Sequence, residues 1–338
     1  MKNVCIVGYG AIGPIHAAAV AKTKNASLYA VCDIDSAKTD LCKKNYDIKT
    51  YNRYEDVLND KDIDSVHICT PHYLHFDMIC DALSAGKSVV AEKPVTMTKH
   101  EFDALKNTAN SEKVCLVLQN RYNPCIEMLK KITESKEYGE IKAIKAIVTW
   151  HRDAKYYASG EWRGTWAYEG GGVLINQAVH TLDFMTYLAG SVNALKANMM
   201  NYSLSGVIET EDTFTSYMNF KNGASGIFFA TNAYAANSAP ELEVVFEEKT
   251  FGYTGRKLVS EGKVLAEDIT PMIGKDYWGT GHEKLIKKYY DDNEYFSLSD
   301  AQDTMNTMFA MYKSAKENGA QDVLVLERDK EAGGILNQ

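Results

Sequence analysis

The feature that most constrains this chain is a glycine pattern close to its first residue. Gly8, Gly10 and Gly13 fit G-x-G-x-x-G, directly after the apolar run 3–7 and before a helical stretch. In a strand–turn–helix unit the first glycine makes the tight turn, the second lets the backbone approach a pyrophosphate, and the third lets the helix pack on the strand. The phosphates then meet the positive end of the helix dipole. The pattern predicts that a dinucleotide binds at Gly8, Tyr9, Gly10, Ala11, Ile12 and Gly13.

An acidic residue follows this motif at the distance expected for a ribose contact. Asp33 lies 20 positions beyond Gly13, at the end of the second apolar run. A carboxylate there accepts hydrogen bonds from the adenosine ribose and repels a 2′-phosphate. The neighbouring Ile34 offers no guanidinium to receive that phosphate. The sequence therefore favours NAD over NADP as the cofactor.

The order of the expected elements predicts the fold class. Short apolar runs alternate with amphipathic stretches in the first third of the chain, which is typical of a parallel sheet covered on both faces. After about Arg121 long strands and hairpin signals take over, among them Asn222-Gly223 and Glu261-Gly262,. We expect an α/β protein with a Rossmann doubly wound parallel sheet at 1–121, the NAD-binding domain. An α+β domain with a mostly antiparallel sheet, covered by helices on one face, is expected at 122–338.

The expected elements are defined by their apolar periodicity. Strands are expected at 3–7, 28–32, 65–69, 88–91, 114–118, 141–150, 212–220, 224–231, 257–260 and 263–266. Helices are expected at 12–22, 37–45, 76–85, 99–109, 124–133, 173–188, 283–291 and 300–318.

Composition and charge exclude several classes of protein. Of 338 residues, 45% are hydrophobic and 24% are charged, which is ordinary for a globular chain large enough for two cores,. The net charge of −8 comes without a basic run longer than a lysine pair, so no nucleic-acid partner is expected,. No stretch has the about 20 apolar residues of a membrane helix, and the N-terminus lacks a secretory pattern. We expect a cytoplasmic protein with no membrane partner.

The cysteines do not form a metal or disulfide pattern. There are seven, an odd number, and no pair has CxxC spacing, so neither a zinc site nor a disulfide framework is expected. Four of them fall in apolar runs and are expected to be small core residues, namely Cys5, Cys32, Cys69 and Cys115,.

A candidate catalytic lysine follows the strand expected at 88–91. Lys93 stands between Glu92 and Pro94, and active groups of open α/β sheets gather at the carboxyl ends of strands. Proline restricts the backbone of the residue before it, and Glu92 can orient the ammonium group. Beside an oxidised nicotinamide, like charge would lower the pKa of Lys93.

The second half carries a polar stripe after three glycines. Gly170–Gly172 lead into a helical pattern in which Asn176, His180 and Asp183 stand at i, i+4 and i+7 and share one face,. A lone histidine is usually a satisfied core or surface residue, but an amide and a carboxylate one turn away favour a functional reading. Asp183 is predicted to fix the tautomer of the His180 ring.

Together these motifs resemble the Gfo/Idh/MocA family of oxidoreductases, which includes glucose–fructose oxidoreductase and inositol dehydrogenase. The resemblance covers essentially the whole chain. Its motifs are Gly8–Gly13, Thr70-Pro71 with His75, Glu92-Lys93-Pro94, Asn120-Arg121-Tyr122, Trp162-Arg163, and the triple glycine with His180 and Asp183. It implies a Rossmann domain joined to a C-terminal domain with a large open sheet that commonly forms homodimers or homotetramers.

The resemblance also implies roles for individual residues. Lys93 and His180 would be the catalytic pair. The residues expected to bind substrate are Asn176, Asp183, Arg121 and Tyr122. The residues expected along the cofactor, besides the glycine motif and Asp33, are Thr70, Pro71, His75, Glu92, Lys93, Asn120, Trp162 and Arg163. Many members of the family carry an aspartate where this chain has Asn176, and an amide cannot take a proton.

The resulting hypothesis is reversible hydride transfer between nicotinamide and a hydroxyl or keto carbon of a sugar, sugar derivative or cyclitol. His180 would take the hydroxyl proton, and Lys93 would stabilise the oxygen. Two other functions fit the same motifs. One is an enzyme that oxidises and re-reduces a sugar around an epimerisation or elimination, with NAD tightly bound. The other is a non-catalytic NAD-binding sensor on the same fold.

Overall fold

The N-terminal part of the chain forms a parallel sheet in the computed structural model, which describes residues 1–271, 273–275, 278–317 and 324–325. The sheet has six strands in the order β3-β2-β1-β4-β5-β6, the order of doubly wound dinucleotide-binding domains. They are β1 (Lys2–Val7), β2 (Ala26–Cys32), β3 (Lys49–Tyr51), β4 (Ser65–Ile68), β5 (Ser88–Ala91) and β6 (Val114–Leu116). The Rossmann fold predicted from the sequence is confirmed.

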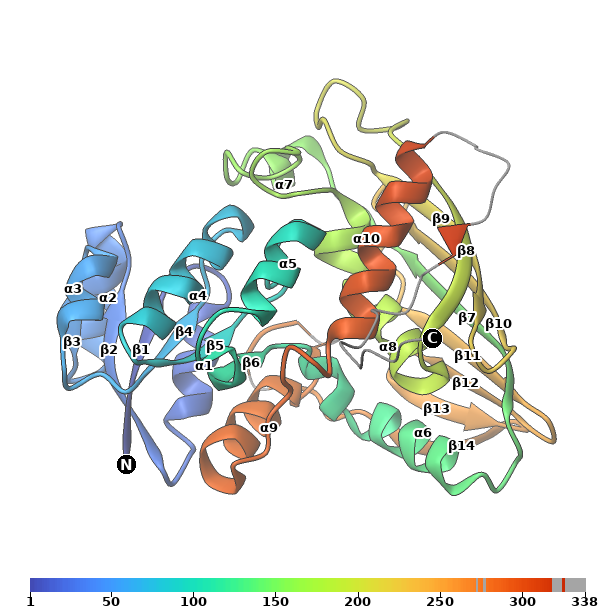
Figure 1. The fold of residues 1–338 in the computed structure, drawn as a ribbon, viewed down its shortest axis with the longest axis horizontal. Coiled ribbons are helices and arrows are strands. Elements are labelled where there is room, and N and C mark those ends of the chain that lie inside the picture. The colour runs from blue at the N-terminus through green and yellow to red at the C-terminus, as the bar shows by residue number, and fades with distance from the viewer. Residues whose placement is uncertain (272, 276–277, 318–323, 326–338) are drawn as a thin grey trace, which may run out of the picture.

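Helices cover both faces of this sheet (Figure 1). They are α1 (Gly13–Val20), α2 (Ser36–Asn45), α3 (Tyr54–Asn59), α4 (His75–Ser84) and α5 (Lys99–Lys106), with the short turns η1 (His72–Leu74), η2 (Ser111–Lys113) and η3 (Gln119–Tyr122). Side-chain caps stabilise the starts of α2, where Asp35 accepts from the Ala37 backbone N–H, and of α5, where Thr98 and Glu101 form a capping box,. The sequence did not predict β3 or α3, because elements of three and six residues show too little periodicity,.

The strand register brings the binding loops to one edge of the sheet. Val7, the last residue of β1, lies beside Cys32 of β2 and Ile68 of β4. Gly8 and Asp33 therefore both lie at the carboxyl edge, where ligands of doubly wound folds bind.

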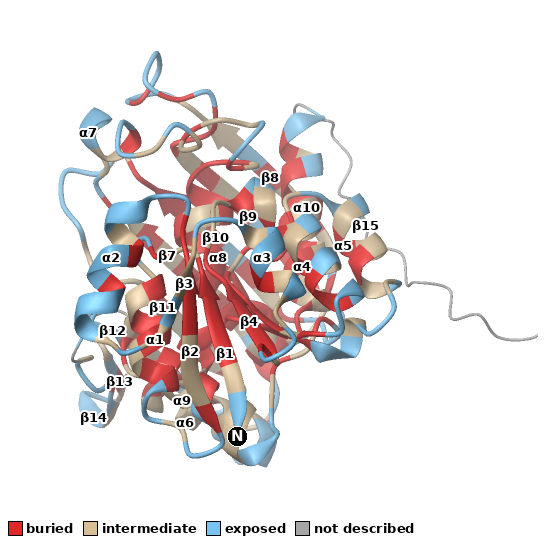
Figure 2. Ribbon diagram, turned by 90° about the vertical axis from the view of Figure 1, so that its left-hand side faces the viewer, coloured by how far each residue is buried: buried red, intermediate tan, exposed pale blue. Residues whose placement is uncertain are grey.

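The inner strands β1, β2, β4 and β5 of the parallel sheet are mostly buried (Figure 2), whereas the edge strand β3 has no buried residue. Val4 and Ile6 lie in one hydrophobic cluster, whereas Cys5 and Val7 lie in another. This explains why these strands are continuous apolar runs in the sequence rather than alternating ones. The four cysteines predicted to be core residues, Cys5, Cys32, Cys69 and Cys115, are buried.

The second sheet has nine strands in the order β14-β13-β12-β11-β7-β10-β9-β8-β15. All neighbouring strands are antiparallel except β7 and β10, so the predicted mostly antiparallel sheet is confirmed. The strands are β7 (Ile141–Thr149), β8 (Val192–Met200), β9 (Thr213–Phe220), β10 (Ser225–Thr231), β11 (Glu241–Phe246), β12 (Thr250–Thr254), β13 (Lys257–Ser260), β14 (Lys263–Glu267) and β15 (Leu324–Val325). Both predicted hairpins form, β9–β10 and β13–β14.

Helices cover one face of this second sheet and leave the other open (Figure 1). The helical elements of this half are α6 (Pro124–Ser135), α7 (Ala154–Tyr157), η4 (Val173–Ala178), α8 (Val179–Ala189), α9 (Gly281–Lys287), η6 (Lys288–Asp292) and α10 (Gln302–Lys316). α8 packs on β7, and α10 packs on β8. On the open face, Tyr217 and Ile227 are more than half exposed. None of the helices among the described residues is long and apolar enough to cross a membrane.

One predicted helix differs from expectation. The segment predicted as a regular helix over 173–188 begins with six residues of π-helix, Val173–Ala178, before α8 continues it. A π-turn is wider than an α-turn, so the i, i+4, i+7 geometry does not hold across the junction. Asn176 lies in the π-segment, whereas His180 and Asp183 lie in α8.

The chain returns to the parallel sheet near its C-terminal end. α9 packs against α1 (Figure 1). Leu285 and Ile286 of α9 belong to the same hydrophobic cluster as Val4 and Ile6 of β1. The division at residue 121 stays a prediction, and this returning segment crosses it.

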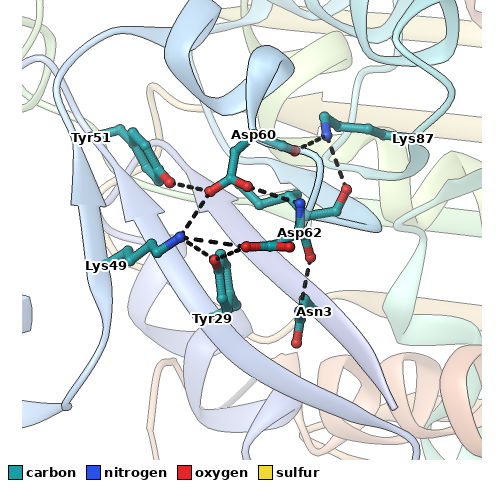
Figure 3. A network of polar contacts seen from close by, with 8 residues as sticks. Asn3, Tyr29, Lys49, Tyr51, Asp60, Asp62 and Lys87 are labelled. Carbon is teal, nitrogen blue, oxygen red and sulfur yellow. Dashed lines mark hydrogen bonds and ion pairs between the residues drawn. The ribbon is translucent and has the colours of Figure 1, made fainter.

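At the edge of the parallel sheet opposite the binding loops, a polar network joins β3 to the loops beside it (Figure 3). Asp60 accepts from the Tyr51 hydroxyl at 2.5 Å and from the Lys49 ammonium at 3.3 Å. Lys87 Nζ donates to the backbone carbonyls of Asp60 at 2.8 Å and Ile63 at 2.9 Å. We call these five residues the Asp60 network.

Candidate active site

The glycine motif has the shape that a dinucleotide requires. Gly8 has a φ of +91°, and a Cβ there would lie 2.7 Å from the Cys69 carbonyl oxygen. A Cβ on Gly13 would lie 2.4 Å from the Gly8 carbonyl oxygen, whereas one on Gly10 would have nothing within 4 Å. The first and third glycines are therefore required by packing, and the second borders open space. Such a surface at the start of α1 fits a pyrophosphate.

Asp33 closes this loop through its own carboxylate. It accepts from the backbone N–H of Tyr9 at 2.7 Å and of Asp35 at 2.9 Å. The ammonium of Lys38 lies 3.4 Å from the same carboxylate. Sequence reasoning missed Lys38, which places a cation beside the expected ribose contact.

Lys93 links the two halves of the protein. Its ammonium donates to the backbone oxygen of Asn176 at 2.7 Å and to the side-chain Oδ1 of Asn176 at 3.1 Å. The peptide bond between Lys93 and Pro94 is cis. Burial lowers the pKa of Lys93 to about 8, although the charges of Glu92 and Glu169 oppose the shift. Lys93 is thus able to exchange a proton near neutral pH.

Glu92 lies in a buried histidine cluster that the sequence did not reveal. Its Oε1 accepts from His16 Nε2 at 2.9 Å and from His282 Nε2 at 3.2 Å. Burial would raise the pKa of Glu92, but these hydrogen bonds outweigh it and hold the pKa well below its ordinary value. His16 Nδ1 pairs with His67 Nδ1 at 2.8 Å, and His67 Nε2 with the Tyr290 hydroxyl at 2.9 Å. We call these five residues the Glu92 network.

Three members of this network have the composition of a metal site. Ligand atoms of His16, Glu92 and His282 all lie within 4.8 Å of one another, and two histidines with a carboxylate suit zinc. The same atoms satisfy each other as hydrogen-bond donors and acceptor without an ion. A cation there would also lie close enough to Lys93 to repel its ammonium. The sequence predicted no metal, and that prediction remains open to metal analysis.

The expected link between Asp183 and His180 is wrong. Asp183 instead accepts from Arg121, at 2.6 Å from Nε and 2.5 Å from Nη2, and from the Thr304 hydroxyl at 2.7 Å. His180 Nδ1 is buried and has no hydrogen-bond partner among the described residues. Burial, and then the charge of Lys93, lower the pKa of His180 to about 3. The imidazole is therefore neutral at physiological pH.

The Arg121–Asp183 pair is enclosed by other side chains. The Arg121 guanidinium lies over the rings of Tyr187 and Phe296, at 4.2 and 4.1 Å from their centroids. Tyr122 packs against the hydrophobic cluster of α1 and α9. Arg121, Tyr122 and Asp183 thus all have contacts within the protein. The substrate-binding role predicted for them stays a prediction.

His75 and Asn120, both predicted to lie along the cofactor, differ in their contacts. His75 is fully buried, and its ring nitrogens contact the backbone oxygens of Pro94 and Thr70, each at 2.8 Å. It therefore holds the turn after β4 against the turn after β5. Asn120 lies on η3, and its buried Oδ1 has no hydrogen-bond partner among the described residues, which leaves it available to a ligand,.

Trp162 and Arg163 approach the Rossmann domain from the second half. The Trp162 ring lies 4.8 Å from the ring of His72, which follows Pro71. The Arg163 guanidinium lies over the rings of Trp162 and Tyr156. Both residues therefore lie at the junction of the domains, and their predicted approach to the dinucleotide from the second domain stays a prediction.

Two buried carboxylates shape the segment around the triple glycine, and sequence reasoning missed both. Glu169 contacts Asn176 Nδ2 and the Gly164 backbone N–H. Glu211 accepts from the backbone N–H of Gly172 at 2.9 Å, and burial raises the pKa of Glu211 to about 7. A Cβ at Gly172 would lie 2.0 Å from the Glu211 carbonyl oxygen, so this glycine permits a close approach.

Two family models match the chain, one over each half. Residues 2–120 match the model of the GFO/IDH/MocA oxidoreductases described as an NAD-binding Rossmann fold. Residues 126–252 match the GFO/IDH/MocA C-terminal domain.

Known proteins similar to this chain are named as oxidoreductases. The uncharacterized oxidoreductase YrbE of Bacillus subtilis is 27% identical over 298 residues, covering 86% of this chain and 82% of its own. Glucose-6-phosphate 3-dehydrogenase of Bacillus subtilis is 25% identical over 274 residues, covering 75% and 74%. The WlbA dehydrogenase of Bordetella pertussis, solved with NADH and UDP-GlcNAcA, is 25% identical with a TM-score of 0.82, covering 97% of this chain and 100% of that one.

Proposed function

Because this chain belongs to the GFO/IDH/MocA oxidoreductase family, we propose that it is an NAD-dependent dehydrogenase acting on a hydroxyl of a sugar, sugar derivative or cyclitol. The observation that carries the proposal is the contact of Lys93, at the carboxyl end of β5, with Asn176 of the second domain. It sets a titratable amine where a substrate held between the domains would meet a cofactor on the glycine motif.

The residues that would hold NAD are those whose geometry fits it. Gly10 offers open space for the pyrophosphate. Asp33 would contact the ribose, and Asn120 offers an unpaired buried oxygen at the same edge. Bound NAD supplies the hydride acceptor for the substrate carbon. The relatives' names, which include a glucose-6-phosphate 3-dehydrogenase and a dehydrogenase solved with UDP-GlcNAcA, support the sugar class.

The pKa values favour an exchange of the roles that the sequence suggested. A general acid or base works best with a pKa near the working pH. At about 8, the pKa of Lys93 meets this condition, whereas at about 3 that of His180 makes the imidazole a weak base. In this proposal Lys93 takes the hydroxyl proton, and the neutral His180 ring donates or accepts a hydrogen bond at the same oxygen. Asn176 is the one residue of 171–180 that is not buried, and it would hold a neighbouring hydroxyl.

We also propose that the open face of the second sheet pairs with another copy of the chain. Tyr217 and Ile227 are cross-strand neighbours there and are 57% and 54% exposed, and adjoining exposed apolar side chains are typical of surfaces that bind another chain. Light scattering of the purified protein tests for a homodimer or homotetramer, and a monomer would exclude both.

The experiment that tests the function measures absorbance of reduced nicotinamide with NAD or NADP across inositols, aldoses, sugar phosphates and nucleotide sugars. We expect NAD reduction with one substrate class and a loss of about 10²–10⁴-fold in turnover for Lys93→Met. His180→Ala should lose less than Lys93→Met while still binding NAD. Bound NAD without reduction across the whole panel contradicts a dehydrogenase and favours the tightly bound, transient-redox enzyme or the sensor.

A further inference from the structure

Glu169 is a buried carboxylate that the mechanism above does not use. It is 1% exposed and stands just before the triple glycine. Its Oε2 accepts from the Gly164 backbone N–H, and its Oε1 contacts Asn176 Nδ2. Its own backbone oxygen contacts His72 Nδ1 of the Rossmann domain at 2.8 Å. Glu169 is thus held from both domains and directed at the amide that Lys93 touches.

A carboxylate next to an amide determines which way the amide points. An ionised carboxylate can only accept hydrogen bonds, so the Asn176 amide must turn its NH₂ group toward Glu169. The amide oxygen then lies on the other side, where it accepts from Lys93 Nζ at 3.1 Å. Glu169 therefore determines what Asn176 offers to Lys93.

The number of N–H groups on Lys93 makes this orientation matter. A neutral amine has two N–H groups and one lone pair. Asn176 accepts from Lys93 twice, through its backbone oxygen at 2.7 Å and its side-chain oxygen at 3.1 Å. When Lys93 is neutral, both N–H groups are used by Asn176 and only the lone pair remains. When Lys93 is charged, the third N–H occupies that position.

The charge of Glu169 also acts on Lys93. Burial lowers the pKa of Lys93, Glu92 and Glu169 raise it, and Arg163 and Lys275 lower it again. Burial raises the pKa of Glu169 itself, and the hydrogen bonds from Gly164 and Asn176 oppose that rise. Glu92 and Glu169 are thus the two carboxylates that favour the ammonium form of Lys93.

We propose that Glu169 is a positioning residue for the proton transfer, which orients the Asn176 amide so that Lys93 keeps one position, lone pair or N–H, free for the substrate hydroxyl. The proposal rests on the dehydrogenase function. In the oxidation the substrate O–H bond breaks and its proton joins the Lys93 lone pair. The O–H electrons become the second carbon–oxygen bond as the hydride leaves the carbon for the nicotinamide. Glu169 neither gains nor loses a proton.

The first test needs no substrate. The pH dependence of Lys93 acetylation by acetic anhydride, followed by mass spectrometry of its peptide, reports the pKa of Lys93 in the folded protein. Glu169→Gln removes the negative charge at constant shape, and we expect the labelling midpoint to fall by about one pH unit. Glu161→Gln, an exposed glutamate of the same segment, is the matched control and should leave the midpoint unchanged. An unchanged midpoint in Glu169→Gln overturns the proposal.

The second test exchanges the carboxylate and the amide. Asn176→Asp alone sets two carboxylates against each other, and Glu169→Gln alone frees the Asn176 amide to turn. Each should lose about 10- to 100-fold in turnover. In the double variant Glu169→Gln/Asn176→Asp, the new amide donates to the new carboxylate, which again offers Lys93 an acceptor. We expect the double variant to be more active than either single one.

A double variant no better than the poorer single variant also overturns the proposal. The two tests separate this proposal from the function itself. Wild-type protein that is silent across the substrate panel refutes the dehydrogenase, while the labelling midpoints still decide whether Glu169 acts on Lys93.

Discussion

Two carboxylates at opposite edges of the same parallel sheet show how differently a polar network can be built. Glu92, at the carboxyl edge, is 7% exposed, and its partners through the Glu92 network are histidines that are themselves buried. Asp60, at the other edge, pairs with Tyr51 and with the half-exposed Lys49 (Figure 3). Water can replace a lost partner at Asp60 but not at Glu92. The first network is therefore suited to hold a reactive site in one geometry, and the second to fasten an edge strand.

The largest expected effect comes from removing the buried carboxylate. Glu92→Ala leaves the His16 and His282 N–H donors buried without an acceptor, which should cost about 2–4 kcal/mol of stability. Asp60→Ala, as the matched change at the other edge, should cost about 1 kcal/mol, because solvent reaches its partners. Thermal unfolding midpoints of the two variants check the order. Equal shifts would show that the Glu92 network has no special dependence on burial.

A smaller effect separates the two networks by pH. Burial, with the charge of His16 adding to it, holds the pKa of His67 well below its ordinary value, and burial also lowers the pKa of His282. A histidine neutral in the folded state takes up its proton on unfolding once the pH is below about 6.5, so its contribution is present above that pH and lost as pH falls. As the pH falls below that value, each such histidine lowers the free energy of unfolding by up to about 1.4 kcal/mol per pH unit.

The Asp60 network should respond only at lower pH. The hydrogen bond from Tyr51 lowers the pKa of Asp60 despite its partial burial, so this stability is present above about pH 4 and lost only below it. Between pH 7 and pH 5 the thermal unfolding midpoint of His67→Gln should therefore fall less steeply than that of the wild type. The midpoint of Asp60→Asn should fall as steeply as that of the wild type. If the midpoints of His67→Gln and the wild type fall in parallel, His67 does not contribute to the pH dependence of stability.

The smallest effect lies within the Asp60 network. Lys87 is 4% exposed and donates to two backbone carbonyls, so Lys87→Met should cost about 1–2 kcal/mol,. Lys49 is exposed, and Lys49→Met should leave the midpoint unchanged within its reproducibility, in low and high salt alike,. A larger loss at Lys49 than at Lys87 would mean that surface charge, and not carbonyl bonding, fastens β3.

The features best predicted from the sequence are those that depend on residues close together in the chain. Gly8 and Gly13 follow a strand and open a helix. The close contact of Gly13 with Gly8 lies within this unit, whereas Gly8 also meets Cys69 of the loop after β4. The Rossmann order and the mostly antiparallel second sheet followed from the rhythm of apolar runs. Lys93 was found because proline and strand position mark it within a few residues.

What the sequence could not predict depends on distant contacts. His282 meets Glu92 from 190 positions away, and no spacing rule reaches that far. Asp183 was paired with His180 from helical spacing, yet Arg121 and Thr304 of other elements take its oxygens. A π-turn at Val173–Ala178 also re-aims Asn176, and nothing in the apolar pattern distinguishes it from an α-turn. Glu169 carries no motif, because its role appears only once Asn176 folds back on it.

The return of α9 and η6 to the Rossmann domain has a consequence for how the protein is made. Leu285 and Ile286 complete the hydrophobic cluster beside α1, and His282 supplies one of the donors to Glu92. A ribosome adding about 5–20 residues per second takes roughly 9–34 s to travel from residue 121 to residue 292. During that interval the first 121 residues have been synthesised, but one face of their core is uncovered. The core of the nascent Rossmann domain is therefore completed only when residues 281–292 have been made, and this interval is when a chaperone would have most to protect.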